Sequence, residues 1–462
     1  MNQKSENLSE QNQPQLIRGL GFYSSLSVVM GAVIGSGVFL VASDITKSVG
    51  SPFWGLSAWV VAGLVSFIGG LIFAELGAMY PKAGGQYVYL REAFHPLVGF
   101  LYGWCLFLVI QAGSIAAVAI AFSNFLSKLI PLSVVELKIY ASLIIVALSV
   151  LNAQGLAKGS KFLDWITSFK VIALLAISGI GLLVYFMGSG TELFDAYLAS
   201  PEGISARGEI NLANSQWGMS EYGIALIAAF WSFDGWNNLS FVAGEIKDPK
   251  KNIPRAFGFG ILIITLLYLV VNLAYHALLP LDVIANSSNV AATWAQVVGG
   301  STGVKIMALL ISASALGCVN GMILAGARVV YAMSVDRTFP KIFGNLHPKK
   351  RSPNAALYLQ MAWTLVLVWS GTYDQLYTYV VFAAFLFYGL AGLGLLRLRK
   401  TAANIERPFR VPFGPLLPVL YVLFIVAFCA NALVEKPFES LAGVGLVALG
   451  IPFYLFFKSR AK

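Results

Sequence analysis

A Gly-Ser-Gly sequence lies in the middle of the first apolar segment of the chain. The segment reads Gly31-Ala-Val-Ile34-Gly35-Ser36-Gly37-Val-Phe39. Each glycine lowers helix stability by about 1 kcal/mol relative to alanine, so we expect the helix to unwind there. N–H groups released at membrane depth persist only where the backbone is buried or lines a cavity, and such groups can hold an anion. The alternative is that these small residues only allow close helix packing.

A second polar interruption lies about 200 residues later. Its sequence is Phe230-Trp231-Ser232-Phe233-Asp234-Gly235-Trp236-Asn237-Asn238. An acid at membrane depth is costly and indicates a functional site. The two interruptions lie five apolar segments apart, which is the spacing expected if each opens one of two inverted repeats. Paired interruptions of this kind favour a binding site between them.

Two charged residues in other apolar segments have to be placed. Lys170 either extends to the membrane surface, as long cationic side chains do, or faces the core and pairs with carbonyl groups released by the first interruption. Glu75 precedes a loop by about one turn and is expected to cap or pair at that end.

The elements that carry these residues are predicted to be membrane-spanning helices. Of the 462 residues, 58% are hydrophobic and only 11% are charged, whereas soluble domains carry about 25% charged residues. A span needs about 20 apolar residues. We predict twelve, at 21–42, 54–80, 95–126, 137–155, 162–188, 219–246, 255–279, 303–333, 355–371, 375–398, 412–432 and 438–457.

The positive charges predict the orientation. Most of the 31 Lys and Arg residues fall in alternate loops, which the positive-inside rule assigns to the cytoplasm. Both termini are therefore predicted to be cytoplasmic, with the chain in the inner (plasma) membrane. The net charge of +10 follows this distribution and does not indicate a nucleic-acid partner.

Further stretches together resemble the amino acid–polyamine–organocation superfamily, and within it the L-type amino acid transporters and their bacterial relatives. Together with Gly35–Phe39, these stretches extend the resemblance from residue 20 to 457. They are Tyr80-Pro-Lys-Ala-Gly-Gly85-Gln-Tyr87-Val-Tyr89-Leu-Arg91-Glu92, Gly235-Trp236-Asn237, Glu245-Ile-Lys-Asp248-Pro, Ile253-Pro254-Arg255-Ala256, Gly317-Cys-Val-Asn320-Gly321 and Glu406-Arg407-Pro408.

The resemblance implies an all-α fold of the leucine-transporter type, with a five-plus-five inverted repeat and two further helices. The expected parts are a disordered cytoplasmic tail (1–19), a first repeat (20–190), an extracellular loop (191–217), a second repeat (218–400) and a C-terminal part (401–462).

The resemblance also implies roles for individual residues. The amides of Ile34, Gly35, Ser36 and Gly37 would bind a substrate carboxylate, and the carbonyls of Phe230, Trp231 and Phe233 would bind its ammonium group. Trp231 would close over the substrate, and Lys170 would take the place of a sodium ion. We expect Gln111, Ser114 and Ser314 to line the side-chain pocket together with Asp234 and Gly235.

Two departures from the mammalian members bear on the substrate and on partners. Asp234 stands where those members usually have a second glycine, so it either senses a substrate's positive charge or is bound by nearby backbone or Asn237. The loop 127–136 lacks the cysteine that attaches a heavy chain, so we expect no disulfide-linked partner. The oligomeric state stays open.

The leading hypothesis is a sodium-independent exchanger or permease for amino acids, with neutral L-amino acids as the expected substrates. The alternative is proton-coupled uptake of a cationic amino acid, a polyamine or a sugar–amino acid conjugate. An enzyme or a channel is disfavoured, since the three histidines lie at span ends and the three cysteines are far apart in the sequence. No metal and no cofactor are expected.

Overall fold

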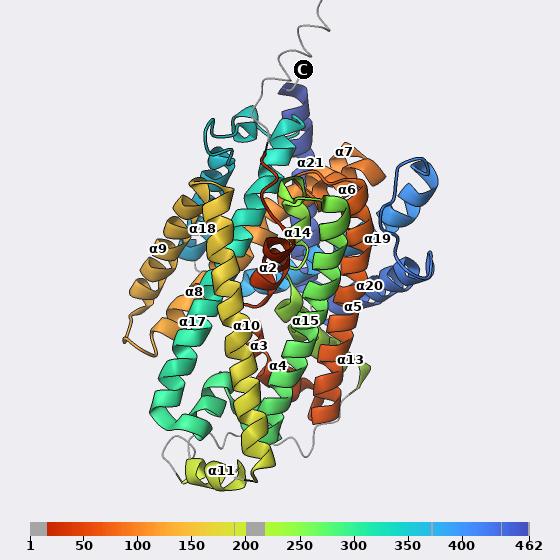
Figure 1. The fold of residues 1–462 in the computed structure, drawn as a ribbon. Coiled ribbons are helices and arrows are strands. Elements are labelled where there is room, and N and C mark those ends of the chain that lie inside the picture. Colours follow the sequence, from red (N-terminus) through yellow and green to blue (C-terminus); the bar gives the residue numbers. More distant parts are fainter. Residues whose placement is uncertain (1–15, 189, 200–217, 371–372, 436, 461–462) are drawn as a thin grey trace, which may run out of the picture.

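The computed structural model describes residues 16–188, 190–199, 218–370, 373–435 and 437–460. These residues are almost entirely helical (Figure 1). The predicted tail 1–19 and loop 191–217 lie largely outside the described residues. The described part of that loop includes a helix that the sequence did not predict, α11 (Gly190–Leu198).

The helices follow the predicted apolar segments. Up to residue 198 they are α2 (Phe22–Val33), α3 (Gly37–Leu40), α4 (Ala42–Val49), α5 (Pro52–Met79), α6 (Gln86–Ala93), α7 (Pro96–Cys105), the π-helical turn η1 (Leu106–Ile110), α8 (Gln111–Leu126), α9 (Val134–Ala153), α10 (Leu156–Phe186) and α11. From residue 219 they are α13 (Met219–Phe233), α14 (Asn238–Phe241), η3 (Ala243–Glu245), α15 (Pro249–Leu278), α16 (Leu281–Asn286), α17 (Val290–Val335), η4 (Lys341–Gly344), α18 (Asn354–Ser370), α19 (Tyr373–Thr401), α20 (Leu416–Glu435) and α21 (Pro437–Arg460).

Within the described residues, nine helical stretches are long and apolar enough to cross a membrane, and the chain is thus a multi-pass membrane protein. Two further apolar helices, α2 and α13, are shorter because each ends at a predicted interruption. Span eight was predicted at 303–333, but α17 begins earlier, at Val290. It contains a break at Gly300, where φ is +57°, so its first turns and the main span are two segments.

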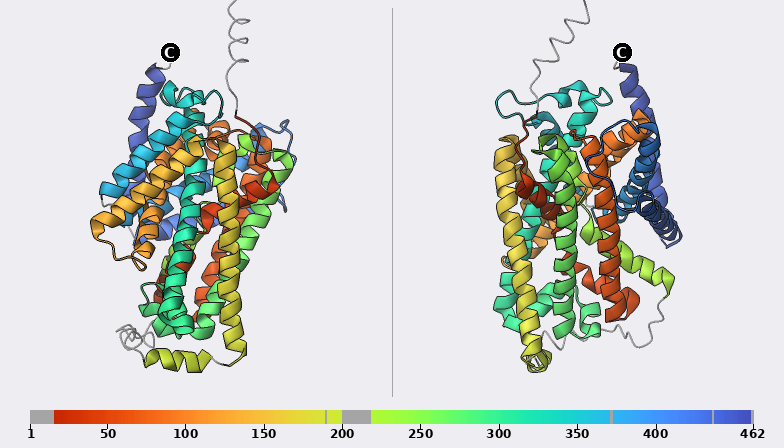
Figure 2. Two further views of the ribbon diagram at one scale, coloured as in Figure 1. Left: turned by 60° about the vertical axis from the view of Figure 1, so that its left-hand side comes forward. Right: turned by 45° about the vertical axis from the view of Figure 1, so that its right-hand side comes forward.

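The long helices α10, α15 and α17 surround α2, and α5 lies beside α15 (Figures 1 and 2). Helix α2 packs against α10, α15 and α17, and α13 packs against α4 and α5. This packing places both interruptions in the core, where backbone groups must find partners within the protein.

Both ends of the described chain lie at one end of the molecule. Leu16 and Asp336 line the same cavity, and the neighbouring Arg337 lines another cavity with Arg460. The start of the chain is held there by hydrogen bonds from the Leu20 amide to the Glu245 carbonyl and from the Lys247 amide to the Leu20 carbonyl. Helix α11 lies at the opposite end (Figure 1).

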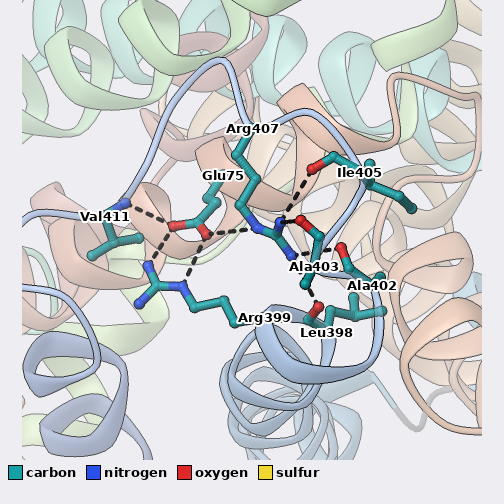
Figure 3. A network of polar contacts seen from close by, with 8 residues as sticks. All are labelled: Glu75, Leu398, Arg399, Ala402, Ala403, Ile405, Arg407 and Val411. Carbon is teal, nitrogen blue, oxygen red and sulfur yellow. Dashed lines mark hydrogen bonds and ion pairs between the residues drawn. The ribbon is translucent and has the colours of Figure 1, made fainter.

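Glu75, at the end of α5, is fully buried and pairs with two arginines, as the sequence predicted for this end of the span (Figure 3). Arg399 donates to both carboxylate oxygens, and the Val411 amide donates to one of them at 2.7 Å. Arg407 donates to four carbonyl groups around the end of α19. The network fixes the segment between α19 and α20 to α5.

Candidate functional site

The first predicted interruption is present. Helix α2 ends at Val33 and α3 begins at Gly37, and the intervening Ile34 has non-helical dihedral angles (φ −72°, ψ 84°). All three residues between the helices are buried. The backbone here therefore unwinds in the interior, and its polar groups need partners other than the helix.

Lys170 provides one such partner. Its ammonium group, on α10, donates to the carbonyl oxygens of Gly31 at 2.9 Å and Ile34 at 2.7 Å. Only 1% of the residue is exposed, so the structure excludes the alternative in which it extends to the membrane surface. Gly317 on α17 makes room for it, because a Cβ atom there would lie 2.6 Å from the Lys170 Cε.

Three further side chains bind the other carbonyl groups of this break. The Ser314 hydroxyl donates to the carbonyls of Ile34 and Gly35, each at 3.1 Å. The Cys318 thiol donates to Ala32, and the Tyr268 hydroxyl donates to Val33. Every carbonyl from residue 31 to 35 thus has a donor from α10, α15 or α17.

The N–H groups of the break divide into two pairs. Those of Ile34 and Gly35 donate to Met30 and Val33, so the expectation that all four amides face a ligand does not hold in this conformation. Those of Ser36 and Gly37 donate to no acceptor in the described part of the chain. The first break therefore presents unused donors, while its carbonyl groups from residue 31 to 35 are all occupied.

The second break has the opposite polarity. Helix α13 ends at Phe233, Gly235 adopts φ +101°, and α14 begins at Asn238. The Asp234 amide donates to Trp231 rather than to Phe230. Among the described residues, no donor outside α13 reaches the carbonyl oxygens of Phe230 and Phe233. This break therefore presents unused acceptors.

The two breaks lie against each other. The Tyr268 hydroxyl is 3.1 Å from the carbonyl oxygens of both Val33 and Ser232, and thus joins them. A Cβ atom on Gly37 would lie 3.0 Å from the Ser232 Cα, and one on Gly235 would lie 3.1 Å from the Ala32 carbonyl oxygen. Glycine at both positions allows this close approach of the two backbones.

Asp234 is bound by a side chain that the sequence did not predict. The Tyr388 hydroxyl, on α19, donates to its carboxylate at 2.8 Å, whereas Asn237 donates to Gln86 instead. A small cavity of about 10 Å³ lies beside Asp234 and is lined by Ser66 and Tyr421 among others. This is about the smallest cavity volume that can hold one water molecule.

The remaining predicted pocket residues differ in how close they lie to the breaks. Trp231 is partly buried in the last turn of α13. Gln111 follows the π-helical turn η1 and donates to Asn238 and to the Met322 carbonyl, so the structure links it to α14 rather than to the first break. Ser114 is buried, and its hydroxyl has no hydrogen-bond partner in the described chain.

Sequence reasoning did not identify Tyr268 or Gly317 as parts of the site. Tyr268 lies in the middle of an apolar helix, where a buried tyrosine needs a partner for its hydroxyl, and that need was the available signal. Gly317 falls in a stretch that carries the family resemblance. Its contact with Lys170 could not be predicted from the sequence, because it depends on how α10 and α17 pack against each other.

Comparison with known proteins identifies relatives of this chain. A family model described as "Amino acid permease" matches residues 20–449. The chain is 29% identical to the mouse b(0,+)-type amino acid transporter 1, over 98% of this chain and 91% of that protein. It is 29% identical to the serine/threonine exchanger SteT of Bacillus subtilis, over 96% and 98%. Identity to the human cystine/glutamate transporter is 28%, over 97% and 86%.

The family match covers nearly the whole chain and includes both interrupted helices. The molecule is therefore a transporter rather than an enzyme, and the chain belongs to the amino acid permease family.

Proposed function

We propose that the protein is a sodium-independent secondary transporter that moves amino acids, neutral L-amino acids above all, across the inner membrane by alternating access. The observation that carries the proposal is the opposite polarity of the two breaks. Ser36 and Gly37 have unused N–H groups, and Phe230 and Phe233 have unused carbonyl groups, among the residues that the structure describes. An α-amino acid carries a carboxylate and an ammonium group on one carbon atom, and it complements both.

In this proposal the substrate carboxylate binds at Ser36 and Gly37, and its ammonium group binds at Phe230 and Phe233. Broken helices in transporters hold charged substrates in this way. The side chain extends toward Ser114, whose buried hydroxyl lacks a partner among the described residues. Trp231 covers the bound molecule. Backbone groups thus recognise what all amino acids share, and side chains set the specificity.

Lys170 supports the sodium-independent part of the proposal. Its ammonium group is a monovalent cation held by two carbonyl groups of the unwound backbone at 2.9 and 2.7 Å. Such carbonyl groups also coordinate sodium in transporters of this kind. A fixed ammonium group supplies the same charge without an ion from solution.

The fold supports the proposed organisation into two repeats, 20–190 and 218–400, followed by 401–462. The described ends of the chain lie at one end of the molecule, as an even number of crossings requires. The nine long apolar stretches, the two interrupted helices and the shorter helix α18 would together make up the proposed twelve spans. We place both termini in the cytoplasm because of the distribution of Lys and Arg.

Counterflow in proteoliposomes tests the proposal. Purified protein is reconstituted, loaded with one unlabelled amino acid and exposed to a panel of labelled ones, in sodium or choline buffer and with or without a pH gradient. We expect saturable counterflow of neutral amino acids at equal rates in sodium and choline. A requirement for sodium would refute the role of Lys170, and absence of counterflow and uptake for every amino acid would refute the proposal.

A second candidate is uptake of a cationic substrate, and Asp234 favours it. This carboxylate accepts a hydrogen bond from Tyr388 but forms no ion pair with the described residues, and an acid without a cationic partner at membrane depth is costly. If Asp234 binds the substrate's second positive charge, Asp234→Asn should abolish transport of lysine and arginine and spare neutral amino acids. Unchanged lysine and arginine transport would reject this candidate.

A further inference from the structure

A groove of about 450 Å³ lies between α5, α15 and the segment that follows α19. It lies at the end of the molecule that holds the start of the described chain, because the Lys247 amide just before α15 binds the Leu20 carbonyl. We call it the interfacial groove. Its principal lining residues are Leu71, Lys251, Arg255, Phe259, Leu262 and Phe409.

The α15 side of the groove changes from cationic to apolar along the helix. Lys251, Arg255, Phe259 and Leu262 are spaced by four, four and three residues, so they share one helix face. Phe259 is 53% exposed and Leu262 is 46% exposed. In a membrane helix, such exposed apolar side chains face lipid tails, and cations near the helix end lie at the level of the headgroups.

The charges of the groove are not balanced by the protein. Lys250, at the rim, pairs with Glu406 at 2.5 Å. Lys251 and Arg255 form no ion pair with any described residue, and no carboxylate of the described chain lines the groove. Two free cations beside an exposed apolar surface complement a molecule with an anionic head and an apolar tail.

We propose that the interfacial groove binds an anionic phospholipid. Its phosphate lies between Lys251 and Arg255, and an acyl chain follows Phe259 and Leu262. Basic pockets between membrane helices bind anionic headgroups in this way. A zwitterionic lipid would bring a second positive charge to the two cations, and free phosphate would leave the apolar half of the groove unused.

Such a lipid would contact α15, the helix whose Tyr268 joins the two breaks. Phe409 forms one wall of the groove, and the Glu75–Arg399–Val411 contacts fix the segment that carries it to α5 (Figure 3). The opposite side belongs to α15. The bound lipid would therefore bridge α5, α15 and the segment after α19, so transport should depend on the lipid composition.

Lipid binding is measured first without any substrate. Full-length protein is delipidated, mixed with phosphatidylglycerol or phosphatidylcholine in detergent and analysed by native mass spectrometry. Each cation near a membrane surface contributes about fivefold to the binding of anionic lipids, so Lys251→Gln with Arg255→Gln should weaken phosphatidylglycerol binding about 25-fold. Lys349→Gln with Lys350→Gln, at exposed positions outside the groove, removes the same charge and should leave binding unchanged.

A third variant tests the apolar half of the groove. A Cβ atom on Gly258, which lines the groove, would meet nothing within 4 Å, so Gly258→Leu fills the groove with the cations in place. We expect it to weaken phosphatidylglycerol binding as well. Equal loss in the Lys349/Lys350 control, equal binding of phosphatidylcholine, or displacement of the lipid by millimolar inorganic phosphate would overturn the proposal.

Transport provides a second readout. Counterflow by the wild type should be faster in vesicles that contain phosphatidylglycerol than in pure phosphatidylcholine, and the groove variants should lose this difference. Loss of the same difference in the Lys349/Lys350 control would refute the proposal that the lipid in the interfacial groove affects transport. Because the mass measurement needs no substrate, failure of the lipid proposal is distinguishable from failure of the proposed transport function.

Discussion

Gly317→Ala is expected to disturb the site without removing any polar group. The new Cβ atom would lie 2.6 Å from the Lys170 Cε and 2.9 Å from its Nζ, so the ammonium group must move. It then weakens or loses a hydrogen bond to Gly31 or Ile34. A hydrogen bond to a charged group contributes about 1.5–3 kcal/mol. Losing one would lower the population of the observed break about tenfold to a hundredfold.

The assay is initial-rate counterflow at equal amounts of reconstituted protein, with the melting temperature as a check on folding. Gly179→Ala is the matched control, because its Cβ atom would meet nothing within 4 Å. The added methyl group would also crowd Ile166. To separate the two effects, Gly317→Ala is also measured in the background of the Lys170→Met variant. If Lys170 transmits the effect, the two changes are not additive. A rate within twofold of the wild type for Gly317→Ala alone would refute the reasoning.

Two further predictions concern the contact between the breaks and the buried ion pair that joins Glu245 of η3 to Arg328 of α17. Gly37→Ala places a Cβ atom 3.0 Å from the Ser232 Cα. Because overpacking costs about 1–3 kcal/mol, counterflow should fall at least about fivefold. An unchanged rate would contradict this prediction, since it would show that the breaks can separate freely. Glu245→Gln leaves Arg328, 1% exposed, without its ionised partner, which costs about 3–5 kcal/mol. Its melting temperature should fall well below that of Glu406→Gln, which breaks an exposed pair, and equal values would contradict the prediction.

The sequence was sufficient to predict the positions of both breaks, because glycines and an acid destabilise a continuous apolar helix in a membrane. It left Lys170 with two alternatives, since a lysine at that depth can face the surface or the core, and helix packing decides between them. The donors Tyr268 and Cys318 could not be assigned to carbonyl groups for the same reason. Asp234 was recognised as unusual, but its partner Tyr388 lies 154 residues away, and only the packing of α19 brings them together.

The central claim is that two backbone breaks hold the two charged ends of an amino acid. It is tested most directly by comparing inhibition of counterflow by a transported amino acid, its α-amide and its N-acetyl derivative. The amide lacks the carboxylate and the acetyl compound lacks the ammonium group, while the side chain is unchanged. We predict that both derivatives inhibit at least tenfold more weakly than the amino acid. Equal inhibition by either one would contradict the assignment of the corresponding break.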